Sequence, residues 1–256
     1  MSALTQFEEW LAKHQHRDPK YGHVYKYHSR SDAHSIALCT FVAEDLLAQC
    51  DALREQASSG KIAFGINIEH LWPNGKKKTI DLAIGRPKTL DPKGSSIKGF
   101  PKAVEMSDAL ISCEAKTAMT EHKKSQPRIF DELGSSHEIV HQGFPYALAV
   151  GITMVNIADK FASPLRQKSR KNIFYLPHRQ PDVAASMIQH LRGLPIREAV
   201  EQQGFDAYCT FVVKTDNISS ASLWTDPPAP QPGDKDHYQT AISRITRFYS
   251  ERFGSI

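Results

Sequence analysis

One segment constrains the fold more than any other part of this 256-residue chain. Residues 146–156 (YALAVGITMVN) are almost continuously apolar. A strand buried on both faces has this composition, whereas a strand with one face in water alternates apolar and polar side chains. The order of the other predicted elements places helices around such a sheet. We therefore predict an α/β protein, a three-layer α/β/α sandwich around a mixed central sheet.

A hairpin is predicted upstream of this strand. Residues 62–72 (IAFGINIEHLW) partly alternate apolar with polar or small side chains, and Pro73-Asn74-Gly75 is a strong turn signal. Residues 79–85 (TIDLAIG) then read as the return strand. Because side chains alternate along a strand, we expect Asp81 on one face and the three larger apolar residues on the other, namely Ile80, Leu82 and Ile84.

A third strand carries residues that suggest chemistry. Residues 109–116 (ALISCEAK) end in Glu114 and Lys116, which share a face two residues apart. If this strand pairs with the hairpin, Asp81 and Glu114 meet at one metal ion. Two carboxylates can bind a divalent cation that polarises a phosphodiester and activates water, while Lys116 positions or deprotonates that water. The Ala115 carbonyl is a further candidate ligand, because hard cations prefer oxygen. The alternative is that Asp81 and Glu114 have no catalytic role and are solvated charges at strand ends.

With these residues in place, the stretch from about 33 to 156 resembles the PD-(D/E)xK nuclease superfamily, best known from type II restriction endonucleases. Ile80 stands where the superfamily motif has proline, and the spacer from Asp81 to Glu114 is long enough to need a filling loop. The resemblance implies a restriction endonuclease-like fold and a Mg²⁺-dependent DNA endonuclease, either a restriction enzyme or a related defence nuclease. Asp81, Glu114 and Lys116 would be catalytic. Double-stranded DNA would be the partner. The active form would be a homodimer, because each chain has one active site and a duplex has two strands to cut.

The remaining elements follow from apolar spacing. A helix is expected over residues 32–57, on which Glu44 is a candidate extra metal ligand, although an exposed glutamate is the commoner outcome. Other helices are expected at 126–133, 182–192 and 234–253, and a strand at 208–214. We expect a single domain over 1–256 with its core at about 33–215, a basic and aromatic segment at 1–31, and a proline-rich connector with a closing helix at 226–256.

Basic residues cluster near the predicted site. The stretch 160–180 contains six lysines and arginines and no acidic residue. Basic loops beside an acidic metal site hold a polyanion against the carboxylates. We expect contacts with DNA from seven side chains: Lys123, Lys124, Arg128, Arg166, Lys168, Arg170 and Lys171.

A competing motif lies at residues 137–141 (HEIVH), which match the HExxH pattern of zinc peptidases with His137 and His141 as ligands and Glu138 as base. Flanking glycines limit the expected helix there to about two turns, and Ser135 with Glu138 fits a capping box. A role for the segment near the DNA or the magnesium ion is therefore preferred. A zinc metallopeptidase and a catalytically inactive DNA-binding module stay open as alternatives.

Composition is that of an ordinary globular protein. The net charge is +4, with 40% hydrophobic and 23% charged residues. No apolar run approaches membrane-spanning length, and the first ten residues do not resemble a secretion signal. The four cysteines form no CxxC pair and lie among apolar residues. We expect buried free thiols and a cytoplasmic protein.

Overall fold

A six-stranded mixed sheet forms the centre of the computed structural model, which describes residues 2–73, 75–219 and 221–255. The strand order is β12-β11-β8-β7-β4-β3. The β7–β8 and β8–β11 pairs are parallel and the other three pairs are antiparallel. The bounds are β3 (Ala63–Leu71), β4 (Lys77–Gly85), β7 (Ile111–Ala118), β8 (Leu148–Asn156), β11 (Ala207–Thr215) and β12 (Ala221–Trp224).

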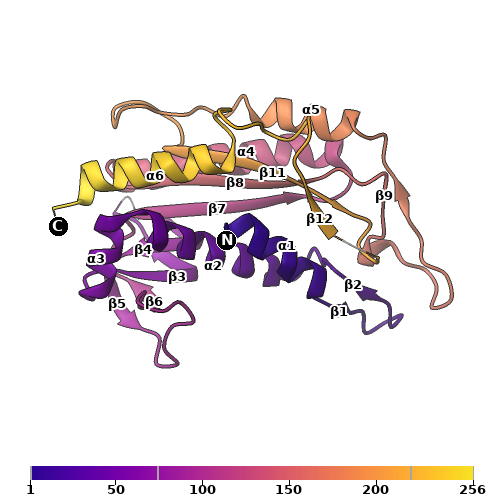
Figure 1. The fold of residues 1–256 in the computed structure, drawn as a ribbon, viewed down its shortest axis with the longest axis horizontal. Coiled ribbons are helices and arrows are strands. Elements are labelled where there is room, and N and C mark those ends of the chain that lie inside the picture. Colours follow the sequence, from indigo (N-terminus) through magenta and orange to yellow (C-terminus); the bar gives the residue numbers. More distant parts are fainter. Residues whose placement is uncertain (1, 74, 220, 256) are drawn as a thin grey trace.

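Helices cover both faces of this sheet, which confirms the three-layer α/β arrangement. One buried cluster joins the sheet to α1 (Ala3–Lys13), α2 (Ala33–Gln49), α3 (Asp51–Ser58) and α6 (Tyr238–Phe253). A second cluster on the opposite face includes α4 (His122–Gly143) and α5 (Asp182–Leu191). In Figure 1, α5 lies above the central strands and α2 and α3 lie below them, with the hairpin of β5 and β6 extending farther down.

The central position of β8 is as predicted, and every residue from Leu148 to Asn156 is buried. Asn156 ends this strand and joins the carboxyl ends of its two neighbours. Its amide nitrogen donates to the carbonyls of Met119, which follows β7, and Thr215, which ends β11. Glu114 and Lys116 lie inside β7, opposite Gly151 and Thr153 of β8, so the residues that carry the predicted chemistry are held within the sheet, before the edge at which Asn156 lies.

The hairpin of β3 and β4 is confirmed by antiparallel pairing from Ala63–Gly85 to Leu71–Lys77. Within its turn, Gly75 has a φ of +78° and donates to the Trp72 carbonyl. Asn74, the middle residue of the predicted turn, lies outside the described residues. The spacer between Asp81 and Glu114 is more ordered than the expected loop, because β5 (Pro87–Leu90) and β6 (Ala103–Met106) form a second antiparallel hairpin.

Two helix predictions were correct in type but wrong in extent. The helix expected over 32–57 is two helices, because Cys50 is extended with a φ of −116° and a ψ of 104°. The helix expected over 126–133 is present as part of the first half of α4, a longer helix of 22 residues. Gly134 does not interrupt α4, since it faces open space and the helix buries Leu133 and Val140 on either side.

The closing helix begins at Tyr238 instead of residue 234. Asp234 and Asp236, in the predicted first turn, bind Arg192 instead. The predicted helix over 182–192 and strand over 208–214 are present as α5 and β11. Elements that were not predicted are α1, β12, the short strands β1 (His16–Arg17), β2 (Val24–Tyr25), β9 (Lys160–Phe161) and β10 (Leu176–Pro177), and the 3-10 turn η1 (Pro164–Arg166).

All four cysteines are buried and free, as predicted. Within the described ranges, no helix has the length and apolar character that crossing a membrane requires.

Candidate active site

Asp81 and Glu114 lie at the point where β4 and β7 stop pairing. The last pair before this point is Leu82 with Cys113, so Asp81 and Glu114 are next in register. The carboxylate of Asp81 accepts a hydrogen bond of 2.7 Å from the main-chain N–H of Ala115. The structure therefore brings Asp81 next to the segment from Glu114 to Lys116, as the sequence predicted.

The backbone is irregular at this place. The register of β3 and β4 skips one position, between the pairs Ile66–Leu82 and Ile68–Ile80, where Asn67 and Asp81 lie; Asn67 has a φ of +53°. Such a conformation is uncommon, and asparagine tolerates it better than most residues. The alternation of side chains between the two faces of β4 is interrupted here. Leu82 and Ile84 belong to the buried cluster that includes α2, whereas Ile80 belongs to the buried cluster that includes α4. The prediction that all three share one face was therefore wrong for Ile80.

Glu114 is held by two lysines. Its Oε1 lies 2.7 Å from Nζ of Lys116, and its Oε2 lies 2.8 Å from Nζ of Lys78. Ser136 on α4 also donates to Oε2 across 3.4 Å. The pairing of Glu114 with Lys116 agrees with their predicted common face. Lys78 and Ser136 were missed, because they reach Glu114 from two other elements: Lys78 from β4, the neighbouring strand, and Ser136 from α4, which packs on β7.

Lys116 has a second carboxylate partner, Glu132 on α4, with Nζ and Oε2 3.3 Å apart. Burial acts to lower the pKa of Lys116, but Glu114 and Glu132 outweigh it and raise the pKa above its usual value. Lys116 is therefore an ammonium ion at neutral pH. In this state it can donate hydrogen bonds to water or phosphate but cannot accept a proton.

The carboxyl group of Asp81 is a weaker acid than an ordinary aspartate. Burial, and then the negative charge of Glu114, raise its pKa from 3.8 to about 6, against the opposing effects of the Ala115 N–H and the nearby lysines. A carboxylic acid perturbed by burial and a specific charged neighbour is a common property of functional sites.

The donor set suits a hard divalent cation. Asp81 and Glu114 supply carboxylate oxygens, and the Ala115 carbonyl can supply another oxygen, which is the chemistry that Mg²⁺ prefers. Among the described residues, no group of three or more His, Cys, Asp or Glu side chains is placed to hold a metal ion. The predicted set contains only two such side chains, so water would complete its coordination.

The position of Glu44 gives no support to a role as metal ligand. Burial, and after it the charge of Asp81 and to a smaller extent that of Glu114, raise the pKa of the Cys39 thiol on α2, so this thiol lies on the side of the helix near the two carboxylates. Glu44 follows Cys39 by five residues, which corresponds to a rotation of roughly 140° around the helix. The half-buried Glu44 side chain therefore leaves α2 on a different face from the one near the two carboxylates.

A cavity of about 640 Å³ opens beside Lys116. Lys124, Arg128 and Glu132 of α4 form one wall, and Arg166 lies on the wall that follows β9. Three of the predicted DNA contacts, Lys124, Arg128 and Arg166, thus line a cavity that reaches Lys116, whereas Asp81 and Glu114 are not part of its lining.

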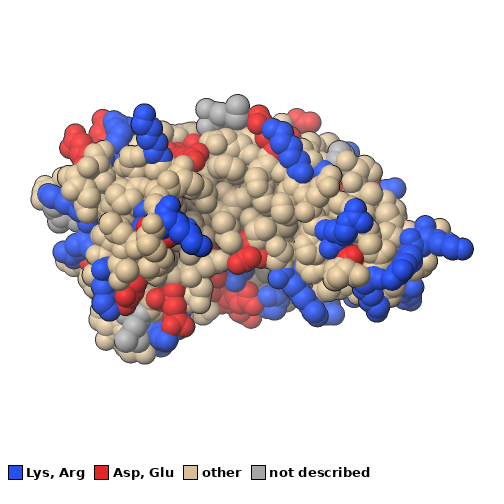
Figure 2. Space-filling view, turned by 90° about the horizontal axis from the view of Figure 1, so that it is seen from below, with Lys and Arg blue, Asp and Glu red and all other residues tan. Residues whose placement is uncertain are grey.

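The other predicted DNA contacts lie outside this cavity. Lys123 is exposed in the first turn of α4, and Lys168, Arg170 and Lys171 are exposed after η1. In Figure 2, lysine and arginine side chains gather at the right-hand end of the molecule, the end at which β1, β2 and β9 lie in Figure 1. The face therefore carries concentrated positive charge at the end where the basic stretch 160–180 lies.

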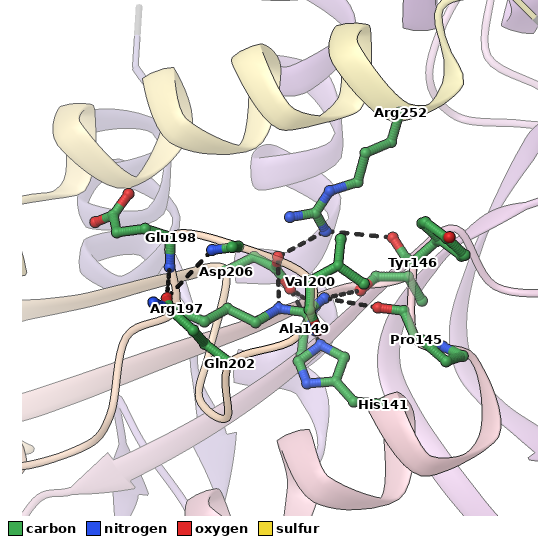
Figure 3. Close-up of polar contacts among 12 residues, drawn as sticks. His141, Pro145, Tyr146, Ala149, Arg197, Glu198, Val200, Gln202, Asp206 and Arg252 are labelled. Carbon is green, nitrogen blue, oxygen red and sulfur yellow. Dashed lines mark hydrogen bonds and ion pairs between the residues drawn. The ribbon is translucent and has the colours of Figure 1, made fainter.

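The HExxH segment belongs to a different part of the molecule. His141 on α4 points to Asp206, with Nε2 and Oδ2 3.1 Å apart. Asp206 is fully buried and also binds Arg197, Arg252 and the N–H of Ala149 (Figure 3). Arg197 is itself fully buried and donates to the carbonyls of residues 145 and 147. This network ties α4 and α6 to the loop before β11.

Two expectations about this segment were wrong. It forms the last turns of a 22-residue helix instead of a helix of about two turns. Ser135 lies in mid-helix and its hydroxyl donates to the Glu132 carbonyl, so there is no capping box. His137 is buried, which lowers its pKa to about 4, whereas Glu138 is exposed.

No family model and no curated protein matches the sequence.

Proposed function

We propose that the protein is a Mg²⁺-dependent DNA endonuclease of the PD-(D/E)xK kind, a restriction enzyme or a related defence nuclease. The observation that carries the proposal is the meeting of Asp81 with Glu114 and Lys116 where β4 and β7 separate. These residue types, in this arrangement, are what phosphodiester hydrolysis requires. A cavity lined by Lys116, Lys124, Arg128 and Arg166 opens on the Lys116 side of this group. Its basic side chains outnumber its two glutamates, Glu121 and Glu132, and so offer net positive charge to a nucleic-acid strand.

Asp81, Glu114 and the Ala115 carbonyl would hold the metal ion. A bound Mg²⁺ ion supplies the positive charge that polarises the scissile phosphate and activates water. Asp81 contributes most above about pH 6, where its carboxyl group is ionised. The N–H of Ala115 holds the Asp81 carboxylate at the end of the strand pair, next to Glu114 in the register.

Lys116 would position the reacting groups. As an ammonium ion it donates hydrogen bonds to the attacking water or to a non-bridging oxygen of the phosphate, where negative charge grows during the reaction. A new bond from the water oxygen to phosphorus replaces one P–O ester bond, leaving a phosphate on one strand end and a hydroxyl on the other. Lys124 and Arg128 would neutralise neighbouring phosphates and hold the strand in place.

Supercoiled plasmid DNA gives a direct test. Purified protein in Mg²⁺ should convert the plasmid to open-circular and linear forms, and excess chelator should stop the conversion. Ca²⁺ in place of Mg²⁺ should support binding with little cleavage. Plasmid that stays supercoiled in Mg²⁺ at high protein concentration, across several DNA sequences, would contradict the proposal.

A further inference from the structure

Both oxygens of the Glu114 carboxylate are occupied by ammonium groups. Lys116 takes Oε1 and Lys78 takes Oε2, at 2.7 Å and 2.8 Å. The pair of Lys78 and Glu114 is mostly shielded from water, with side chains 16% and 11% exposed. A cation cannot coordinate either oxygen of Glu114 in this arrangement unless an ammonium group moves away or shares the oxygen. Lys78 therefore competes directly with a metal ion.

Each lysine has a second acceptor within reach. Nζ of Lys78 donates to the Ser136 hydroxyl across 2.5 Å, and Nζ of Lys116 lies 3.3 Å from Glu132. Both acceptors are on α4, which packs over β7. An ammonium group displaced from Glu114 consequently keeps a polar partner and is not left unpaired in a partly buried place.

The balance of charge around Glu114 also opposes metal binding in the absence of DNA. Three carboxylates, those of Asp81, Glu114 and Glu132, are balanced by three cations, Lys78, Lys116 and Arg128. A divalent ion entering this balanced group adds two positive charges close to Lys78, which opposes binding. A phosphate group arriving in the adjacent cavity brings negative charge and removes that opposition. Metal and nucleic acid should therefore each strengthen the binding of the other.

We propose that Lys78 is a positioning residue that holds Glu114 in the metal-free protein and thereby makes tight metal binding depend on bound DNA. This inference rests on the proposed function and deepens it. The structural alternative is that the pair of Lys78 and Glu114 only stabilises the fold. Partly buried ion pairs are weak evidence for that role, because desolvation offsets much of their attraction.

Calorimetric titration with Mn²⁺ or Ca²⁺ separates the two roles without relying on cleavage. Lys78→Met should bind the ion more tightly than wild type in the absence of DNA, by on the order of tenfold or more, since a unit charge near the ion is removed. Lys78→Arg should stay close to wild type. Lys77→Met is the matched control, because Lys77 is the next residue, is 64% exposed and pairs with Glu69 instead. It should bind like wild type.

A second measurement uses the wild-type protein and so does not depend on the folding of a variant. Ca²⁺ affinity measured with a DNA duplex present should exceed the affinity measured without it. Equal affinities with and without DNA, or no gain in Lys78→Met, would overturn the role of Lys78 while the nuclease proposal stands. If wild type neither binds the ion with DNA nor cleaves in Mg²⁺, the proposed function itself fails.

Discussion

The N–H of Ala115 donates to the carboxylate of Asp81 across 2.7 Å, where β4 and β7 stop pairing. The Asp81 side chain on β4 thus accepts a hydrogen bond from the β7 main chain just beyond the last paired residues of the two strands. This bond fixes Asp81 beside Glu114 although burial and the charge of Glu114 both disfavour its ionised form. An arrangement that keeps two carboxylates close at a cost in stability is typical of sites shaped by function.

The first prediction concerns stability. The folded-state pKa of Asp81, about 6, lies above the usual 3.8, so the folded protein binds this proton more tightly than the unfolded chain. The contribution of Asp81 to stability therefore falls as the pH rises from about 4 to about 6. Asp81→Asn should be more stable than wild type at pH 8, by up to about 3 kcal/mol, and the difference should shrink below pH 6. Urea unfolding at several pH values measures this. A variant less stable than wild type at pH 8 would refute it.

A second prediction concerns the network around Asp206. Asp206→Ala leaves the fully buried guanidinium of Arg197 without its carboxylate partner, which should lower the free energy of unfolding by about 3–5 kcal/mol. Asp234→Ala is the control, because its pair with Arg192 is exposed and should contribute less than about 1 kcal/mol. Chemical denaturation compares the two. Similar small losses for both variants would show that the network does little to hold the fold.

His141 should affect stability more than cleavage. Its ring contacts Asp206, whereas the proposed site involves other residues of α4, Ser136 and Glu132. His141→Ala should retain most of the Mg²⁺-dependent cleavage measured at a temperature where it is folded, and purified wild type should contain no stoichiometric zinc. Elemental analysis that finds one zinc per chain would instead favour the HExxH peptidase.

Binding of DNA should depend on salt through the basic residues. Replacing Arg166, Lys168, Arg170 and Lys171 by alanine should weaken binding to all sequences alike and flatten the log–log salt dependence by roughly 0.9 for each phosphate that is no longer neutralised. Sequence preference should survive, because phosphate contacts position the protein and base contacts specify the site. Arg54→Ala on α3 is a control for loss of charge elsewhere. An unchanged slope in the fourfold variant would mean that this stretch does not touch DNA.

The active form is predicted to be a homodimer. Each chain carries one candidate site, and two sites related by symmetry would cut the two strands of a duplex in one event. Light scattering of the protein with and without DNA measures the assembly. A monomer under both conditions would leave only successive nicking of the strands.

The parts of the fold that the sequence predicted are those with local signals. The apolar composition of Leu148–Asn156 indicated a central strand, and the hairpin signal placed Asp81 near Glu114. Other features depend on tertiary structure. Ser136 and Glu132 join the site only because α4 packs on β7, and Lys78 reaches Glu114 from β4 only because β4 lies beside β7 in the sheet. Likewise Gly134 suggests a helix end by its residue type, but burial of its neighbours outweighs its low helix propensity of about 1 kcal/mol.

The most direct test of the central claim compares plasmid cleavage rates in Mg²⁺ for two pairs of variants. Glu114→Gln and Lys116→Met alter the proposed site, whereas Glu69→Gln and Lys77→Met alter the same residue types in an exposed ion pair on the neighbouring strands. We predict that the first two lose at least about a hundredfold in rate while circular dichroism shows them folded, and that the second two cleave like wild type. Cleavage at near wild-type rate by Glu114→Gln or Lys116→Met would contradict the assignment of the active site.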